Sequence, residues 1–528
     1  MERRERLDPR NWKSVPTATS AKPWWKYDGI GWPSRLSEVS QLKTIVAILV
    51  AFVIWGYVDV SRRGQLVNGH PEYHRTDFTV FTEAGAALFD GRNPYEVTNA
   101  RGWFYLYPPL FAMLVAPLSA SDTVSQVTIW FGISIALGFG CYAESRRIWR
   151  LIHPASSDVG GGCDVSPWVG VCAGLAVALP TLDCLQRGQI GIALVYPLLL
   201  GFRLTLGGGS WWSRGLGGVI LAWPVVVKLI PALPVGCLVL QQWAAVFAAG
   251  RDRNSTVARA LASTSGLAVG AIVFLLLLPA SFLGWDANLG HLNTWARKVA
   301  TNQDVGKVHG FHFDSLANQS LTNATHLLAA KLSGREVSRT EYPHWFAFDT
   351  EVANRRRAAS STHAFTLIAR GLVLALLGSI VLRVGLREDP PGQAAAFGLA
   401  GMAIVLVSPL AWAHYFVLWL PAILTVPPWL AGRGHIRAAK WLCVVPVFLT
   451  WSQYLATRWV GQIGLLGLGS MVWFLAVCAV SSRVLARKPD KILGAFGILR
   501  ADDRHEKPLP GRHPAVLGRS TQIDVLGS

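Results

Sequence analysis

The chain is a series of long apolar stretches, most of them close to the ~20 residues that an α-helix needs to cross the hydrocarbon core of a bilayer. Within lipid every backbone polar group must be satisfied inside the segment itself, so stretches of this kind predict helices. The sequence therefore predicts an all-α polytopic membrane protein with about 12 transmembrane helices. The twelve stretches are 43–60, 123–145, 167–184, 189–206, 213–228, 230–247, 259–283, 364–385, 393–412, 415–431, 440–457 and 463–485.

The balance of charged residues agrees with this class. Only 15% of residues are charged, whereas soluble proteins have about 25%. The net charge of +18 could indicate nucleic acid, but the lysines and arginines lie in short clusters between the apolar stretches and in the two tails. That distribution is typical of the cytoplasmic loops of a membrane protein. We expect the lipid bilayer as a partner, a multi-pass protein of the cell membrane, and no nucleic acid.

The basic clusters also predict an orientation. Arg146, Arg147 and Arg150 fall on the same side as the basic amino terminus if the apolar run 107–120 is re-entrant or interfacial rather than a crossing. A helix break at 228–231 is needed for the same reason. The positive-inside rule makes that side the cytoplasm.

Three regions follow from this orientation. Residues 1–42 are predicted to be a basic cytoplasmic segment, and 43–486 the transmembrane domain. Its loops 61–122 and 284–362 face outward and carry short interfacial helices. Residues 487–528 are predicted to be a basic, disordered cytoplasmic tail.

Asp77 is the main candidate for catalysis. Phe78, Phe81, Gly85 and Leu88 recur at helical spacing after it, so we expect a helix that lies on an apolar surface at the outer mouth. Asp77 is then either the cap of that helix or a general base that removes a proton from an acceptor hydroxyl.

Lys228 and Arg187 are the candidate cations. Lys228 lies between two apolar stretches, where a cation at membrane depth usually has a partner or a function. A phosphate group would be a natural partner, and a lysine that extends to the interface is the alternative. Arg187 and Gln189 lie at an outer turn, where Arg187 could instead pair with Asp183 four residues earlier.

The remaining candidates lie at the same predicted face. His414 ends a stretch that begins at Ser408, and could donate to a phosphate or orient a sugar, or be purely structural. Asn318 and Gln319 have amides suited to sugar hydroxyls, close to a predicted helix from 315 to 331. Tyr107 opens the short apolar run and is grouped with the residues that bind the donor.

These residues occur in motifs that resemble glycosyltransferase family 87, whose members are integral membrane enzymes of the GT-C type. The resemblance spans roughly residues 75–420. The matching motifs are Asp77-Phe-Thr-Val-Phe81, Gly91-Arg-Asn-Pro-Tyr95, Tyr107-Pro-Pro-Leu-Phe111, Gly188-Gln-Ile190, Lys228-Leu-Ile-Pro231, Asn318-Gln-Ser-Leu321 and Ser408-Pro-Leu-Ala-Trp412 with His414.

The resemblance implies a hexosyltransferase that uses a polyprenyl-phosphate sugar, with mannose as the first choice and arabinofuranose as the alternative. A glycolipid or glycan would be the acceptor, and Asp77 the base of an inverting displacement. It implies no nucleotide, cofactor or metal, and the seven cysteines show no zinc-ligand spacing. A transporter or flippase, or a partner-binding membrane protein, is the competing class.

Overall fold

The computed structural model describes residues 38–65, 76–100, 102–152, 167–207, 209–249, 252–297, 318–333, 360–387, 389–408 and 410–486. The chain divides into two compact units, residues 1–485 and 486–528, and the first contains the helices described here except for the last residue of α20. Of the basic segment predicted at 1–42, residues 1–37 lie outside the described residues and 38–42 begin helix α1, and the tail predicted at 487–528 also lies outside the described residues.

Helices make up the fold, and no strand occurs in the described ranges, where the only β contacts are two isolated bridges. Each of the twelve predicted apolar stretches lies on a helix. The helices are α1 (Glu38–Gly64), α4 (Thr123–Ile152), α5 (Pro167–Arg187), α6 (Gly191–Gly207), α7 (Trp211–Val227), α8 (Ala232–Ala248), α9 (Arg253–Ile272), α15 (Ser360–Gly385), α16 (Pro390–Val407), α17 (Leu420–Ala431), α18 (Ile436–Leu455) and α20 (Leu465–Ala486).

Seven helical segments in the described ranges are long and apolar enough to cross a membrane. One of them continues from α9 through a π-helical turn, Val273–Leu277, into α10 (Leu278–Leu283). Another joins the 3₁₀ helix η8 (Ala413–Trp419) to α17. The predicted class, an all-α membrane protein, is therefore confirmed.

The predicted break at Lys228 is present. Helix α7 ends at Val227, Lys228 has extended backbone, and α8 begins at Ala232. Glycines that pack backbone to backbone show that α7 and α9 are parallel, because Gly215 lies against Gly266 and Ala222 against Gly270. Helices α7 and α8 are therefore two separate helices rather than one continuous helix.

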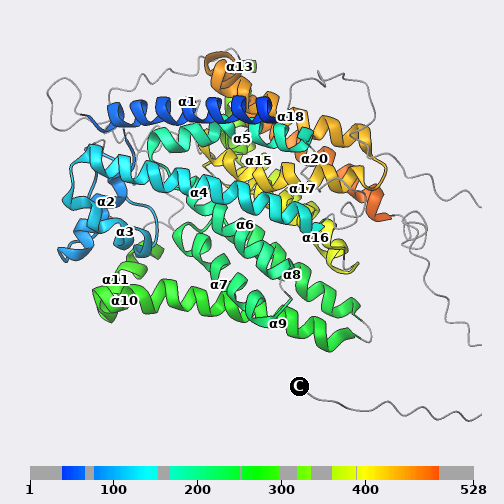
Figure 1. Ribbon diagram of the computed structural model, residues 1–528, viewed down its shortest axis with the longest axis horizontal. Helices are drawn as coiled ribbons and strands as arrows, with labels where there is room; N and C mark the ends of the chain where they lie inside the picture. Colours follow the sequence, from blue (N-terminus) through cyan, green and yellow to red (C-terminus); the bar gives the residue numbers. More distant parts are fainter. Residues whose placement is uncertain are drawn as a thin grey trace, which may run out of the picture. The chain divides into compact units, whose positions relative to one another are not determined.

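Four short helices gather at one end of the long ones (Figure 1). They are α2 (Thr79–Phe89), α3 (Pro109–Val115), α10 and α11 (Trp285–Trp295). Helix α3 continues as a 3₁₀ turn to Ala120, and these 12 residues reach at most ~24 Å even at the 3₁₀ rise, which is less than the bilayer core. We call this the Asp77 end, because α2 begins just after Asp77.

Helix α2 has the buried apolar side that its sequence predicts. Phe78, Phe81, Gly85 and Leu88 are all buried, and Phe78 stacks on Trp130 of α4 with ring centroids 5.0 Å apart. A side chain at Gly85 would collide with the backbone of α3, which explains why a glycine lies there. Helix α2 is thus fixed tightly against α3 and α4.

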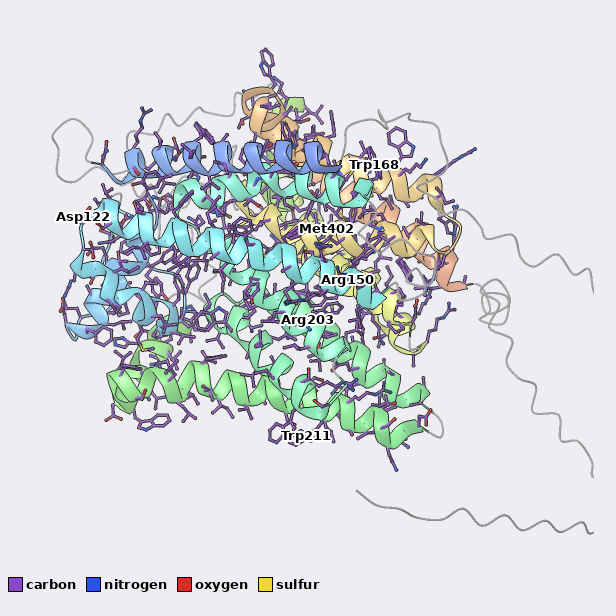
Figure 2. All side chains as sticks on the ribbon, in the orientation of Figure 1. Asp122, Arg150, Trp168, Arg203, Trp211 and Met402 are labelled. Carbon is purple, nitrogen blue, oxygen red and sulfur yellow. The ribbon has the colours of Figure 1, made fainter. Side chains whose placement is uncertain are left out.

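Buried charge lies toward the other end of α4 and α6. Glu144 is 1% exposed and forms ion pairs with Arg147 and Arg203. Figure 2 shows Asp122 and Arg150 near opposite ends of α4. The basic side chains of these two helices are therefore separated from the Asp77 end by most of the helix length.

The helix predicted at 315–331 begins later than expected. Helix α13 covers Leu321–Leu332, and the hydroxyl of Ser320 accepts a hydrogen bond from Asn323 N as its N-cap. Asn318 pairs with Trp412 in an isolated bridge, so it lies before the helix in extended backbone. Residues 298–317 and 334–359 of this predicted loop lie outside the described residues.

Candidate active site

The site is built on the turn that ends α5. Arg187 is the last helical residue, and Gly188 has a φ of +71°, the left-handed conformation common after a helix end. A side chain there would come within 2.7 Å of Phe78 Cβ. Glycine thus allows the start of α2 to lie directly on this turn.

Backbone hydrogen bonds hold the two segments together. Asp77 N donates to the carbonyl of Arg187 at 2.9 Å, and the hydroxyl of Thr76 donates to the same oxygen at 3.3 Å. The last carbonyl of α5 is therefore satisfied by the chain that carries Asp77. The carboxylate is placed by main-chain geometry as well as by its own contacts.

The Asp77 carboxylate is buried, with 9% of the residue exposed. Gln189 Nε2 donates to its Oδ2 at 3.0 Å, and Arg187 Nη1 lies 3.9 Å from the same oxygen. The predicted group of Asp77, Arg187 and Gln189 therefore does come together. Gln189 and Arg187 thus both approach the same carboxylate oxygen of Asp77.

Asp183 contacts three side chains next to Asp77. Arg187 Nε donates to its Oδ1 at 2.6 Å, while Tyr454 donates to Oδ2 at 3.1 Å. His414 Nδ1 lies 3.7 Å from Oδ2. The pairing of Arg187 with Asp183, considered as an alternative, is thus present together with the more distant contact to Asp77.

Lys228 lies in a tyrosine cage formed by Tyr107 and Tyr415. Its Nζ donates to Tyr415 Oη at 2.7 Å and to Tyr107 Oη at 3.0 Å, and it lies 4.0 Å from the Tyr415 ring centroid. An ammonium group has three N–H donors, so these two bonds leave one for a ligand. The cation has no carboxylate partner among the ion pairs of the described residues.

The cage and the acidic group are neighbours. His414 contacts the ring of Tyr415, with centroids 4.9 Å apart. Burial raises the pKa of the Tyr107 phenol well above its usual value, with further contributions from Tyr415, Tyr105 and the charge of Asp77. Tyr107 thus remains protonated while it accepts a hydrogen bond from Lys228.

Asn318 and Gln319 occupy a different position. Both are fully buried, and Asn318 Oδ1 accepts a hydrogen bond from Ala411 N while Gln319 N donates to the carbonyl of Ala411. Gln319 Oε1 also accepts from Gly467 N at 3.4 Å. The two residues therefore hold the segment that leads to His414.

Sequence reasoning did not select Asp183, Tyr415 or Tyr454 as site residues. Tyr415 directly follows His414, and Asp183 is one helical turn before Arg187, so both were adjacent to selected residues. Tyr454 lies on α18, far along the chain, and no local pattern connects it to the site. In the described ranges no group of three or more His, Cys, Asp and Glu side chains is arranged to hold a metal ion.

Comparison with known proteins gives one match. The model of glycosyltransferase family 87 matches residues 105–409, which is more than half of the chain. The match includes Tyr107, the turn after α5, Lys228, Asn318 and Gln319. His414 lies shortly after its end, and Asp77 lies well before its start at residue 105. No curated protein and no solved structure matched the chain.

Proposed function

The chain belongs to glycosyltransferase family 87 and is a membrane glycosyltransferase, and from this premise we propose the reaction that it catalyses. The enzyme transfers a hexose, with mannose as the first choice, from a polyprenyl-phosphate donor to a glycolipid or glycan. The transfer takes place at the extracytoplasmic face of the cell membrane, where the Asp77 end of the bundle lies. The arrangement of twelve passes proposed from the sequence gives this orientation.

Asp77 acts as the general base. It takes the proton of an acceptor hydroxyl, and the hydroxyl oxygen then forms a bond to the anomeric carbon of the donor sugar. The bond between that carbon and the phosphate oxygen breaks, and its electron pair leaves with polyprenyl phosphate. Attack from the face opposite the leaving group inverts the anomeric centre.

The cage around Lys228 receives the leaving group. A positive charge and hydroxyl donors that are held in place before reaction stabilise the charge that develops on the phosphate. Lys228 has one N–H left for this role, and Tyr107 and Tyr415 fix its position. Arg187 and His414 lie on the side of the acidic group and would contact the donor phosphate or sugar.

The observation that carries this proposal is a buried carboxylate, Asp77, at the same end of the helices as a lysine, Lys228, that two tyrosines hold in place. Gln189 holds Asp77 in place for the acceptor. We assign Asn318 and Gln319 to the support of the 411–414 segment, and direct contact of either amide with a sugar stays a prediction. An arabinofuranosyl donor is the alternative substrate.

Removal of the base tests the proposal. Asp77→Asn keeps the size of the side chain, and we expect its kcat to fall by ~10²–10⁴ because proton transfer contributes about that much. The measurement is transfer of radiolabelled sugar from synthetic decaprenyl-phosphate-mannose, with arabinofuranose and glucose carriers as parallel donors. Glu83→Gln is the control, since Glu83 is exposed on the same helix. Near wild-type transfer by Asp77→Asn would refute the assignment.

A further inference from the structure

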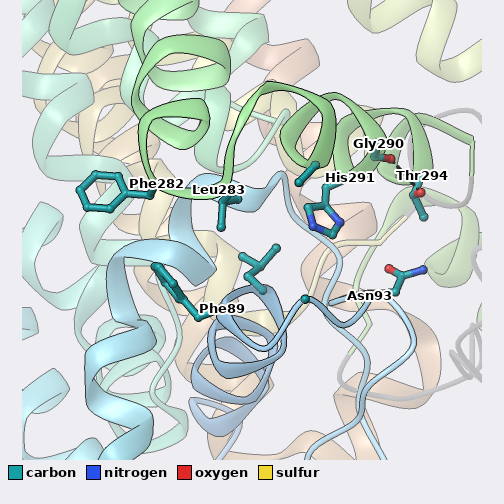
Figure 3. A pocket seen from close by; sticks show the side chains of 10 residues that line it. Phe89, Asn93, Phe282, Leu283, Gly290, His291 and Thr294 are labelled. Atoms are coloured by element: carbon teal, nitrogen blue, oxygen red, sulfur yellow. Dashed lines mark hydrogen bonds between the residues drawn. The ribbon is translucent and has the colours of Figure 1, made fainter.

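A groove lies beyond the far end of α2, away from Asp77. The turn after α2 forms one wall and the corner between α10 and α11 forms the other (Figure 3). Its volume is about 570 Å³, within the ~300–1,000 Å³ of small-molecule sites. The side chains that characterise it are Leu88, Phe89, Asn93, Phe282, His291 and Thr294.

The lining combines aromatic surface with neutral polar groups. Phe89 and Phe282 are 53% and 61% exposed, so their rings are available to a ligand. No lining residue is Asp, Glu, Lys or Arg. Burial lowers the pKa of His291, so its imidazole is neutral at physiological pH.

His291 also has unused hydrogen-bonding capacity. Neither of its ring nitrogens has a hydrogen-bond partner within the described part of the chain, and a neutral imidazole both donates and accepts. Figure 3 shows the imidazole projecting from α11 toward the turn that carries Asn93. The groove therefore suits a ligand with hydroxyl groups and one apolar face, which is the chemistry of a sugar ring.

Both walls of the groove connect to the residues of the candidate active site. Helix α2 connects them directly, and its 11 residues, Thr79–Phe89, span ~16 Å. On the other wall, Trp295 Nε1 of α11 donates to the carbonyl of Leu106 at 3.2 Å, next to Tyr107. A single sugar held at Asp77 cannot also reach a site at that distance.

We propose that this groove binds a distal sugar of the acceptor glycan, with Phe89 and Phe282 against the ring and Asn93, His291 and Thr294 at its hydroxyls. The inference rests on the proposed function, because it assigns the groove to the acceptor of that reaction. An acceptor of several sugars can extend from Asp77 along the ~16 Å of α2 to the groove, whereas a single sugar cannot. The enzyme should therefore distinguish acceptors by the length of their glycan.

Acceptors of different length test the groove. Synthetic lipid-linked acceptors with one and with four sugar units are compared in wild type, His291→Ala and Phe282→Ala. Loss of one hydrogen bond or one stacked ring should raise KM for the four-sugar acceptor by roughly 3- to 10-fold and leave kcat unchanged. KM for the one-sugar acceptor should not move. Leu289→Ala is the control, since Leu289 is exposed on α11 but does not line the groove.

Two outcomes separate the inference from the function on which it rests. Wild-type protein that transfers no sugar from any donor would remove the proposed function. Active wild type with the same KM change for both acceptors, or with no change, would overturn the groove assignment alone.

A binding measurement applies even to an inactive variant. Ala287→Cys, in a cysteine-free background, places a thiol in the lining, and its reaction with a maleimide is followed over time. The four-sugar acceptor should slow that reaction, and the same lipid without sugars should not. Equal protection by the bare lipid would make the groove a lipid site and reject the glycan.

Discussion

At the scale of single residues, Asp183 decides how strongly Arg187 acts on Asp77. Arg187 is 2.6 Å from Asp183 and 3.9 Å from Asp77, so it is closer to the carboxylate that has no proton-transfer role in the proposed reaction. Close pairing with Arg187 would stabilise ionised Asp77 and weaken it as a base. In the proposed reaction Asp183 is thus a positioning residue for Asp77.

Asp183→Asn should release Arg187 toward Asp77. We expect kcat to fall and the acid limb of the kcat/KM profile to move to lower pH, since a weaker base stays ionised to lower pH. The measurement is the pH–rate profile of sugar transfer. Tyr454→Phe is the matched control, because it removes a hydrogen bond to Asp183 but no charge. An acid limb that stays in place in Asp183→Asn would contradict this role.

At the scale of elements, the contact between α7 and α9 fixes the position of Lys228. The two helices touch backbone to backbone, and a Cβ at Gly266 would lie 2.0 Å from the carbonyl oxygen of Gly215. Small residues at four-residue spacing, such as Gly266 and Gly270, allow such close approach in membrane helices. Since α7 ends at Val227, directly before Lys228, this packing also places the cage.

Alanine at two glycines should therefore have opposite effects. Gly266→Ala forces the helices apart, and we expect a loss of ~1–3 kcal/mol in the free energy of unfolding. Gly236→Ala on α8 has no atom within 4 Å of its new Cβ and should gain about 0.5–1 kcal/mol from helix propensity. The apparent Tm in detergent measures both. A Gly266→Ala protein as stable as Gly236→Ala would show that the helices do not pack this closely.

At the scale of the whole molecule, the basic residues of α4 and α6 lie at the end of these helices opposite to the candidate active site. Helix α6 begins near Gln189 and reaches Arg203 after ~20 Å, and α4 ends beside Arg150. Basic residues at one end and a polar site at the other favour a cytoplasmic and an extracytoplasmic side, respectively. The proposed orientation follows from this separation.

Labelling from one side of the membrane tests the orientation. In a cysteine-free, active background, Glu96→Cys and Trp285→Cys should react with an impermeant maleimide in intact cells. Arg150→Cys should react only after permeabilisation, because its side faces the cytoplasm in the proposed arrangement. All three positions are exposed, so access depends on the membrane and not on burial. Labelling of Arg150→Cys in intact cells would reverse the orientation.

The sequence alone determined the helices and several residues of the site. The predicted apolar stretches coincide with helical segments, because lipid leaves the backbone no other way to satisfy its polar groups. Seven of the segments in the described ranges are long and apolar enough to cross a membrane, and the count of twelve crossings stays a prediction. The position of α13 was less accurate, since Ser320 caps the helix and the pattern did not distinguish it from Ser315. Asp77, Lys228, Arg187 and Gln189 were found because polar residues beside apolar stretches are few.

Only the tertiary structure decided which of these residues meet. Asp183 joins Arg187, His414 and Tyr454 from three helical segments, and Tyr107 and Tyr415 enclose Lys228 from positions far apart in the chain. Periodicity reports which side of a helix is apolar, but it carries no information on the helix that packs against it. The amides of Asn318 and Gln319 illustrate the limit, because the sequence marks them as polar and only the packed structure shows that they support the chain before His414.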